Sequence, residues 1–147
     1  MAGIMGGMTS AVSESTNDIL LESAWFNPRV IAGKARKYGK HTDSSHRFER
    51  GVDPKLQLIA IERATSLILE ICGGMAGPVS ETISEKDLPE TKKIELDYEA
   101  VAKQLGMELD SREIDEILHR LGLKKEKNSH WQIPSWRFDL EIQQDLI

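Results

Sequence analysis

The stretch DPKLQLIAIERATSLILEICGG at residues 53–74 decides the fold of the first half of this chain. Asp53 and Pro54 are typical of helix starts, because aspartate accepts hydrogen bonds from free backbone N–H groups and proline fits the first helical position. Helical spacing then continues as far as Gly73-Gly74 in seven apolar residues: Leu56, Ile59, Ala60, Ala64, Leu67, Ile68 and Ile71. The pattern predicts a helix over 54–72, which at about 1.5 Å per residue spans roughly 28 Å and can serve as the spine of a domain.

Three further elements are expected before this helix. The apolar run DILLESAWF at 18–26 predicts a buried strand. Asn27-Pro28 repeats the cap and proline signal, so a helix is expected over 28–38, with Gly39 at its end. The segment KHTDSSHRFERG at 40–51 has neither a helical nor an alternating apolar period, and it is expected to be a polar loop.

After the long helix, residues 79–83 predict a strand, and the acidic segment SEKDLPETKK at 84–93 predicts a linker. We therefore expect two domains, over residues 1–88 and 89–147. In the second domain the expected order is strand 94–96, helices 98–105 and 111–121, and short strands near 123–126 and 131–133. Two helices followed by a hairpin is a winged-helix-like order, so the predicted fold class is α+β.

Composition limits the class of protein. The 147 residues are 39% hydrophobic, with no apolar run near the roughly 18 residues of a membrane helix and no signal-peptide pattern at the start. The single cysteine, Cys72, excludes an internal disulfide and a multi-thiolate zinc site, and it is expected to be a small buried side chain. The expected compartment is the cytoplasm, with no membrane partner.

Charge is unevenly distributed along the chain. The net charge is −5, but residues 28–50 carry seven Lys/Arg against two Asp/Glu, whereas residues 51–147 carry 12 against 19. A local basic stretch of this kind is either a solvated surface or a contact for nucleic-acid phosphates.

Three groups of polar residues are candidates for chemistry. Glu22 lies in an apolar run, where an ionised carboxylate needs a partner, so it is either a paired residue at the edge of the core or a hydrogen-bond acceptor at the end of a pocket. The segment 41–46 contains His, Thr, Asp and Ser, but its spacing identifies no nucleophile with its base. A loop tied down by its own hydrogen bonds explains it equally well, and zinc on His41 and His46 is a weak third reading.

Asp139 and Asp145 are the third group. Six residues correspond to about 600° on a continuous helix, so these carboxylates would not share a helix face. They can meet at one magnesium ion only if Asp139 precedes the helix, where its simpler role is that of an N-cap.

Several motifs together resemble the bacterial phenylalanine-tRNA ligase beta subunit. They are AGIMGG at 2–7, LLESAWFNP at 20–28, IAGKARKYGKHTDSSHRFERGVDP at 31–54, GGMAGP at 73–78 and PSWRFDLEIQQDLI at 134–147. The resemblance covers essentially the whole chain. It implies the second half of the editing domain (1–88), followed by a winged-helix-like domain (89–147) that is cut before the region packing against the catalytic alpha subunit.

The resemblance also implies a function and partners. In the family, the alpha subunit activates phenylalanine with ATP and charges tRNA(Phe), within a heterotetramer of two alpha and two beta subunits. The beta-subunit editing domain hydrolyses tyrosine wrongly attached to that tRNA, because an apolar pocket cannot strongly reject an added hydroxyl.

Roles for individual residues follow from the same resemblance. It places the hydroxyl-recognising glutamate at Glu22, and Gly6 and Thr42 on the pocket wall. Ser44 falls at a pocket position that is alanine in some relatives. Asp139 and Asp145 are implied as Mg2+ ligands, with two further glutamates beyond residue 147. No catalytic residue is assigned, because the family's editing-site arginine and histidine lie in an earlier segment that this chain lacks, so the chain alone is expected to be inactive.

Two other interpretations stay open. The second half is alternatively a free-standing nucleic-acid-binding module of winged-helix type, although its predicted second helix carries Glu113, Asp115 and Glu116, which would repel phosphate. The chain is alternatively an independent tRNA deacylase, if the arginine and histidine are dispensable.

Overall fold

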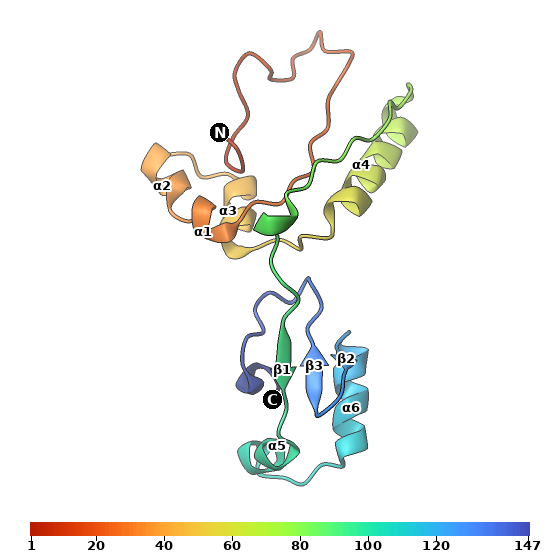
Figure 1. Cartoon of the computed structure of the whole chain (residues 1–147). Coiled ribbons are helices and arrows are strands. Elements are labelled where there is room, and N and C mark those ends of the chain that lie inside the picture. The colour runs from red at the N-terminus through yellow and green to blue at the C-terminus, as the bar shows by residue number, and fades with distance from the viewer. The chain divides into compact units, whose positions relative to one another are not determined.

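The computed structural model describes all residues from 1 to 147, and the chain divides into two compact units, Met1–Leu88 and Pro89–Ile147 (Figure 1). The second unit contains a three-stranded antiparallel sheet with two helices, so the predicted α+β class is confirmed. None of the helices combines the length and the apolar character that crossing a membrane requires.

The first unit begins its helical part with α1 (Pro28–Ile31) and α2 (Lys34–Tyr38). The predicted cap is confirmed, since Asn27 Oδ1 accepts a hydrogen bond from the Arg29 backbone N–H at 3.0 Å and Pro28 occupies the first helical position. The single helix expected over 28–38 is wrong. Gly33 adopts a left-handed conformation with φ +73°, which divides the segment into two short helices, and Gly39 ends the second as expected.

The segment 40–51, expected to be a loop, is helical over most of its length as α3 (Asp43–Arg50). A reciprocal capping box begins this helix: Ser45 N donates to Thr42 Oγ1 at 3.1 Å, and Thr42 N donates to Ser45 Oγ at 3.0 Å. The loop prediction failed because α3 buries Ser45 rather than an apolar stripe, so its sequence has no apolar period.

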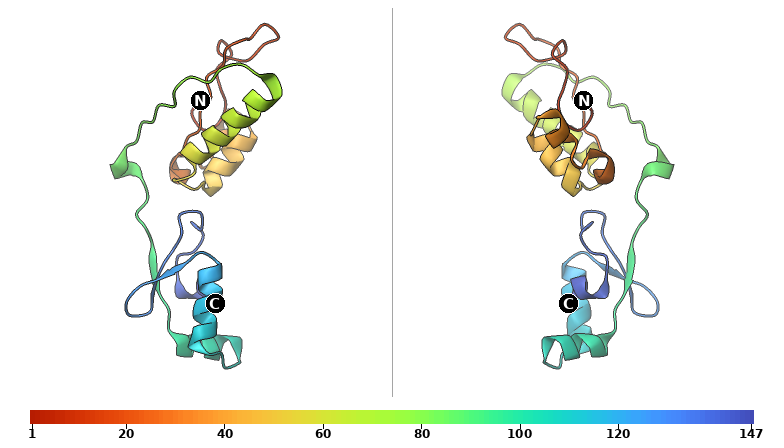
Figure 2. Two further views of the ribbon diagram at one scale, coloured as in Figure 1. Left: turned by 90° about the vertical axis from the view of Figure 1, so that its right-hand side faces the viewer. Right: turned by 90° about the vertical axis from the view of Figure 1, so that its left-hand side faces the viewer.

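The long helix is confirmed as α4 (Gln57–Cys72), beginning three residues later than expected and ending at Gly73. Figure 2 shows it in yellow-green, with extended chain leaving its end. None of its residues is buried, and Ile71 is 79% exposed. Cys72, expected to be buried, is also exposed.

The two strands expected in the first unit, over 18–26 and 79–83, are absent. Both segments are extended, but neither has a strand beside it to complete its backbone hydrogen bonds, and Leu20 is 97% exposed. A short 3-10 helix, η1 (Glu85–Asp87), follows the second segment. The buried apolar residues of this unit are Ile4, Ile31 and Ala35.

The second unit contains the elements predicted for it in the predicted order. They are β1 (Lys93–Glu95), α5 (Tyr98–Leu105), α6 (Ser111–Arg120), β2 (Lys124–Lys125) and β3 (His130–Gln132). A 3-10 helix, η2 (Gln143–Leu146), follows them and was not part of the predicted order. Asp97 caps α5 and Asp110 caps α6, each accepting from backbone N–H groups of the first turn. The sheet order is β1-β3-β2, and Ile94 lies opposite Trp131.

Trp131 is the centre of the core of the second unit and has no exposed surface. Its neighbours in the core come from the sheet, both α-helices and the C-terminal segment: Ile94, Leu96, Val101, Ile114, Leu118, Leu123, Ile133 and Leu140. Every element of the unit therefore depends on the volume that this side chain fills.

We expect Trp131→Ala to lower the free energy of unfolding of this unit by about 3–5 kcal/mol, because it removes buried area and leaves a cavity. Urea unfolding followed by far-UV circular dichroism measures the loss. Trp136→Ala is the matched control, since Trp136 is 55% exposed and should cost about 1 kcal/mol or less. Equal losses in the two variants would contradict the central role of Trp131.

Candidate functional site

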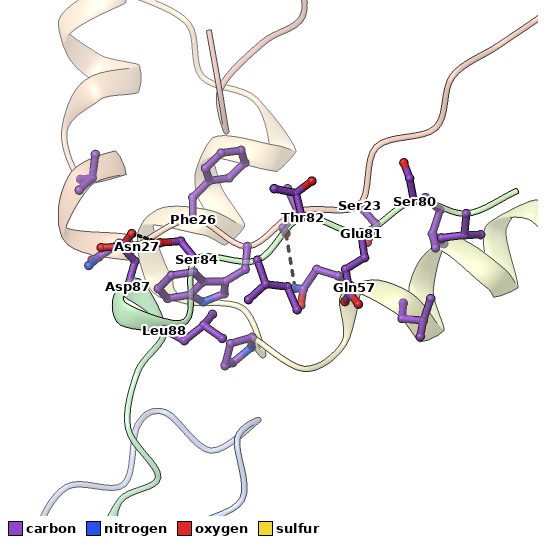
Figure 3. A pocket seen from close by; sticks show the side chains of 18 residues that line it. Ser23, Phe26, Asn27, Gln57, Ser80, Glu81, Thr82, Ser84, Asp87 and Leu88 are labelled. Carbon is purple, nitrogen blue, oxygen red and sulfur yellow. Dashed lines mark hydrogen bonds between the residues drawn. The ribbon is translucent and has the colours of Figure 1, made fainter.

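The first unit contains a cavity of about 560 Å³ between three segments (Figure 3). Its walls are residues 23–27 with Val30, the start of α4 with the preceding Pro54, and residues 79–84 with Asp87 and Leu88. Apolar lining comes from Trp25, Phe26, Leu58 and Ile61. A volume of this size suits a small organic group, which apolar walls bury and a few polar groups orient.

Gln57 connects two of these walls. Its Nε2 donates to the carbonyl oxygen of Asp53 at 2.9 Å and to that of Ala24 at 3.5 Å, which ties the 23–27 segment to the start of α4 (Figure 3). On the third wall, Ser84 Oγ donates to Asp87 Oδ2 at 2.6 Å. These contacts hold extended chain that no sheet supports.

The lining of the cavity contains no histidine, lysine or arginine. Its ionisable groups are Glu81 and Asp87, and its hydroxyls are those of Ser23, Ser80, Thr82 and Ser84. Ser84 is hydrogen-bonded to the carboxylate of Asp87, but a carboxylate is a weak base for a serine hydroxyl, so these walls suit binding and orientation rather than covalent catalysis.

Glu22 immediately precedes Ser23 of the cavity wall. The structure leaves its side chain exposed and outside any ion pair, so it is not the paired core-edge glutamate that the residues alone allowed. An exposed carboxylate is available to accept a hydrogen bond from a ligand hydroxyl.

Thr42 is the predicted pocket residue with the most contacts. Its hydroxyl accepts from Ser45 N and donates to the carbonyl oxygen of Ile4 at 2.5 Å. The structure therefore brings Thr42 and the N-terminal turn, which continues to the exposed Gly6, together. Ser44 is exposed on the first turn of α3.

The histidines of the same segment do not form a metal site. His46 Nδ1 lies 2.9 Å from Arg50 Nη1, and no group of three or more His, Cys, Asp or Glu residues in the chain is arranged to hold a metal ion. The zinc interpretation of His41 and His46 is therefore wrong.

Both predicted magnesium ligands already have partners in this chain. Arg137 donates to both carboxylate oxygens of Asp139, at 2.9 to 3.2 Å, and these hydrogen bonds hold the pKa of Asp139 below its ordinary value. Asp145 Oδ2 accepts from the backbone N–H groups of Glu141 and Ile142, which likewise lowers the pKa of Asp145. Asp145 thus belongs to the capping box of η2, and the N-cap role that the residues alone allowed for Asp139 is not observed.

Two occupied carboxylates do not by themselves fit a magnesium ion, which needs about six oxygen ligands in octahedral geometry. To bind Mg2+, Asp139 would have to be released from the guanidinium of Arg137, and further oxygen ligands would have to join the two carboxylates.

Sequence analysis missed the most connected polar cluster of the second unit. Tyr98 Oη and Lys125 Nζ each donate to Asp115 at 2.6 Å, and Lys125 Nζ lies 5.1 Å from the Tyr98 ring centroid. Partial burial raises the pKa of Asp115, but the hydrogen bonds from Lys125 and Tyr98 outweigh it and hold the pKa below 3.8. The hydrogen bond to Asp115 raises the pKa of Lys125 above 10.5.

Each half of the chain matches a known domain family. Residues 1–73 match the B3/4 domain, and residues 94–147 match the tRNA synthetase B5 domain. The two families occupy the two structural units in order. The chain therefore belongs to the class of tRNA synthetase subunits.

Beta subunits of phenylalanine–tRNA ligase from bacteria are similar to the whole chain. Identity is 52% for Yersinia pestis, 51% for Dickeya dadantii and 54% for Idiomarina loihiensis, each over 150 aligned residues. The chain belongs to the family of phenylalanine–tRNA ligase beta subunits. Each alignment covers 100% of the chain and 19% of the relative, so the chain spans about a fifth of the length of these relatives.

We expect the isolated chain to show no saturable Mg2+ binding at about millimolar ion, because Arg137 and backbone N–H groups occupy the oxygens of Asp139 and Asp145. Isothermal titration calorimetry measures this directly. The Arg137→Gln variant frees Asp139 and is the informative comparison. Clear binding by the unaltered chain would mean that these two carboxylates suffice.

The Asp115 cluster predicts a pH dependence of stability. The contribution of Asp115 to stability is fully present above pH 3.8, the ordinary pKa of this group. It is lost as the pH falls through the lower pKa that Asp115 has in the folded state. Asp115→Asn should therefore cost about 1 kcal/mol at neutral pH and make the acid loss of stability less steep. Urea unfolding between about pH 7 and pH 2 measures both effects. Glu116→Gln, on the same helix but exposed and unpaired, should change neither.

Proposed function

We propose that this chain serves hydrolytic editing and subunit assembly within a bacterial phenylalanine–tRNA ligase. The observation that supports this is the similarity along the whole chain, at about 50% identity, with both domain families in order. The complete enzyme attaches phenylalanine to tRNA(Phe) with ATP in the cytoplasm. Its partners are the alpha subunit, in a tetramer of two alpha and two beta subunits, and tRNA(Phe).

Editing is needed because phenylalanine is difficult to distinguish from tyrosine by binding alone. Tyrosine differs by one hydroxyl, which an apolar pocket rejects weakly, whereas a site that hydrogen-bonds the hydroxyl distinguishes the two strongly. We assign that hydrogen bond to Glu22, because it is an exposed acceptor beside the wall formed by residues 23–27. A phenylalanine ring would leave this carboxylate without the bond.

Other residues hold the remaining parts of the proposed editing pocket. Thr42 ties the N-terminal turn that carries Gly6 to α3, and Ser44 lies two residues further along. Residues 1–88 are then the C-terminal half of the editing domain, and residues 89–147 the winged-helix-like domain that follows it. The magnesium site of the complete enzyme uses Asp139 and Asp145 only together with glutamates outside this chain.

We infer that an oriented water attacks the ester, with the tRNA terminus assisting, because the cavity lining contains no histidine or lysine that could activate one of its serines as a nucleophile. The ester bond to the ribose breaks as the water oxygen bonds to the tyrosyl carbonyl carbon, and tyrosine and free tRNA leave. The chain alone is then inactive. A covalent tyrosyl-enzyme trapped on a side chain of the complete domain would contradict this mechanism.

Charge pairing weighs against the alternative of a free-standing nucleic-acid module in the second unit. Four cations of this unit form ion pairs within it at 2.6 to 2.9 Å: Lys92 with Glu141, Lys93 with Glu126, Lys125 with Asp115, and Arg137 with Asp139. Cations neutralised in this way contribute little to binding phosphates.

The test uses the complete ligase with Glu22→Ala in its beta subunit. We expect hydrolysis of tyrosine-charged tRNA(Phe) to fall by about tenfold or more, the value of one hydrogen bond to a charged group, with phenylalanine charging unchanged. Deacylation of labelled tyrosyl-tRNA measures the first, and aminoacylation with phenylalanine the second. Glu14→Ala, another exposed glutamate of the N-terminal segment, is the control. Unchanged clearance in the Glu22 variant would remove Glu22 from the pocket.

A further inference from the structure

Five cationic side chains gather on two short consecutive helices of the first unit. Arg29, Lys34, Arg36, Lys37 and Lys40 lie on α1, on α2 and directly after α2. Between residues 23 and 42 the sequence contains no aspartate or glutamate. All five side chains belong to exposed residues, so the α1–α2 surface is positive in a chain whose net charge is −5.

These five charges lack partners within the chain. None of them takes part in an ion pair, whereas Arg50 of the neighbouring α3 pairs with Glu49 at 2.9 Å. Unpaired cations of like sign that lie close together repel one another, so they gain from an external anion.

The backbone beneath the charges is fixed. Ile31 of α1 and Ala35 of α2 are buried, and α1 packs against α3. The apolar side of the two helices is thus held by the unit while the cations remain in solvent. Figure 1 shows α1, α2 and α3 grouped together.

An aromatic side chain lies among these cations. Tyr38 is 51% exposed, and Lys37 Nζ lies 5.9 Å from its ring centroid. Exposed aromatic rings between lysines and arginines suit nucleic acid, because bases stack on the ring while cations bind the phosphates.

We propose that the α1–α2 surface, formed by Arg29, Lys34, Arg36, Lys37 and Lys40, binds the phosphate backbone of tRNA. The choice of tRNA rests on the proposed function. Lys40 is two residues before Thr42, whose hydroxyl holds the N-terminal turn at Ile4. Phosphates bound on α2 therefore bring the nucleic acid next to the residues assigned to the editing pocket.

The test measures binding of the 147-residue chain to a fluorescently labelled, uncharged tRNA(Phe) transcript by anisotropy at about 50 to 200 mM salt. We expect the combined variant Lys34→Gln, Arg36→Gln, Lys37→Gln to bind about tenfold more weakly or worse. Its dependence of log affinity on log salt should be shallower by about 2 to 3, roughly one for each phosphate contact removed. Lys34→Arg with Lys37→Arg should keep the affinity.

The control variant Lys103→Gln, Arg112→Gln, Lys127→Gln removes the same charge from exposed, unpaired positions of the second unit. It should bind within about twofold of the unaltered chain. Equal losses in the two triple variants, or no binding by the unaltered chain at about 50 mM salt, would overturn the proposal. Displacement of the tRNA by polyglutamate as effectively as by unlabelled tRNA would overturn it in favour of an acidic protein partner.

Failure of the proposed function and failure of the surface proposal give different experimental results. The Glu22→Ala chain should bind the transcript normally, since Glu22 is outside the α1–α2 surface. If this chain binds normally and the complete ligase with Glu22→Ala still clears tyrosine, the editing assignment of Glu22 fails while the α1–α2 surface stands. If the surface variant binds as tightly as the unaltered chain, the surface proposal fails whatever the editing result.

Discussion

Burial of apolar side chains is the constraint on which both units depend, and the two units meet it unequally. Eight buried apolar residues of the second unit surround Trp131, whereas the first unit buries Ile4, Ile31 and Ala35. Burial is the main favourable term in folding, so the second unit has a core of its own and the first is held largely by single polar contacts.

Those polar contacts explain why the first unit still positions its residues. Thr42 joins α3 to the N-terminal turn through one hydroxyl that accepts at one end and donates at the other. Gln57 joins the start of α4 to the 23–27 segment by donating from Nε2 to the carbonyl oxygens of Asp53 and Ala24. A net hydrogen bond contributes only about 1 kcal/mol, so the segments around the cavity open more easily than the sheet of the second unit. Sites that must admit a ligand are drawn from such regions.

The sequence predicts the second unit well because its signals are local. Asp97 and Asp110 cap helices, Gly106 ends one, and the apolar residues of α6 follow the helical period. The strands expected in the first unit do not form, because an apolar run such as 18–26 becomes a strand only where a neighbouring strand completes its hydrogen bonds. The start of α3 does have a local sequence signal, the Thr-x-x-Ser form of the capping box.

The candidate site residues also divide into those that the sequence predicts and those that only the fold brings together. The family resemblance supplies Glu22, Gly6, Thr42 and Ser44, and the structure supplies a contact between Thr42 and the N-terminal turn alone. The Asp115 cluster has no signal in the sequence, because its members are 17 and 10 residues apart and meet only through the fold. The cavity lining is equally invisible before folding, since it combines three separate segments.

Whether a cation is paired in the fold shows more clearly than its charge alone whether it can bind an external anion. The basic stretch 28–50 looks uniform in the sequence, but the fold joins Arg50 to Glu49 and His46, while the cations of α1 and α2 have no acidic neighbour. Arg137, bound to both oxygens of Asp139, shows the opposite extreme, because this bidentate pair fixes a turn and leaves neither partner free. An exposed cation on a fixed helix keeps its full attraction for an external phosphate, and the α1–α2 surface has five of them immediately before Thr42.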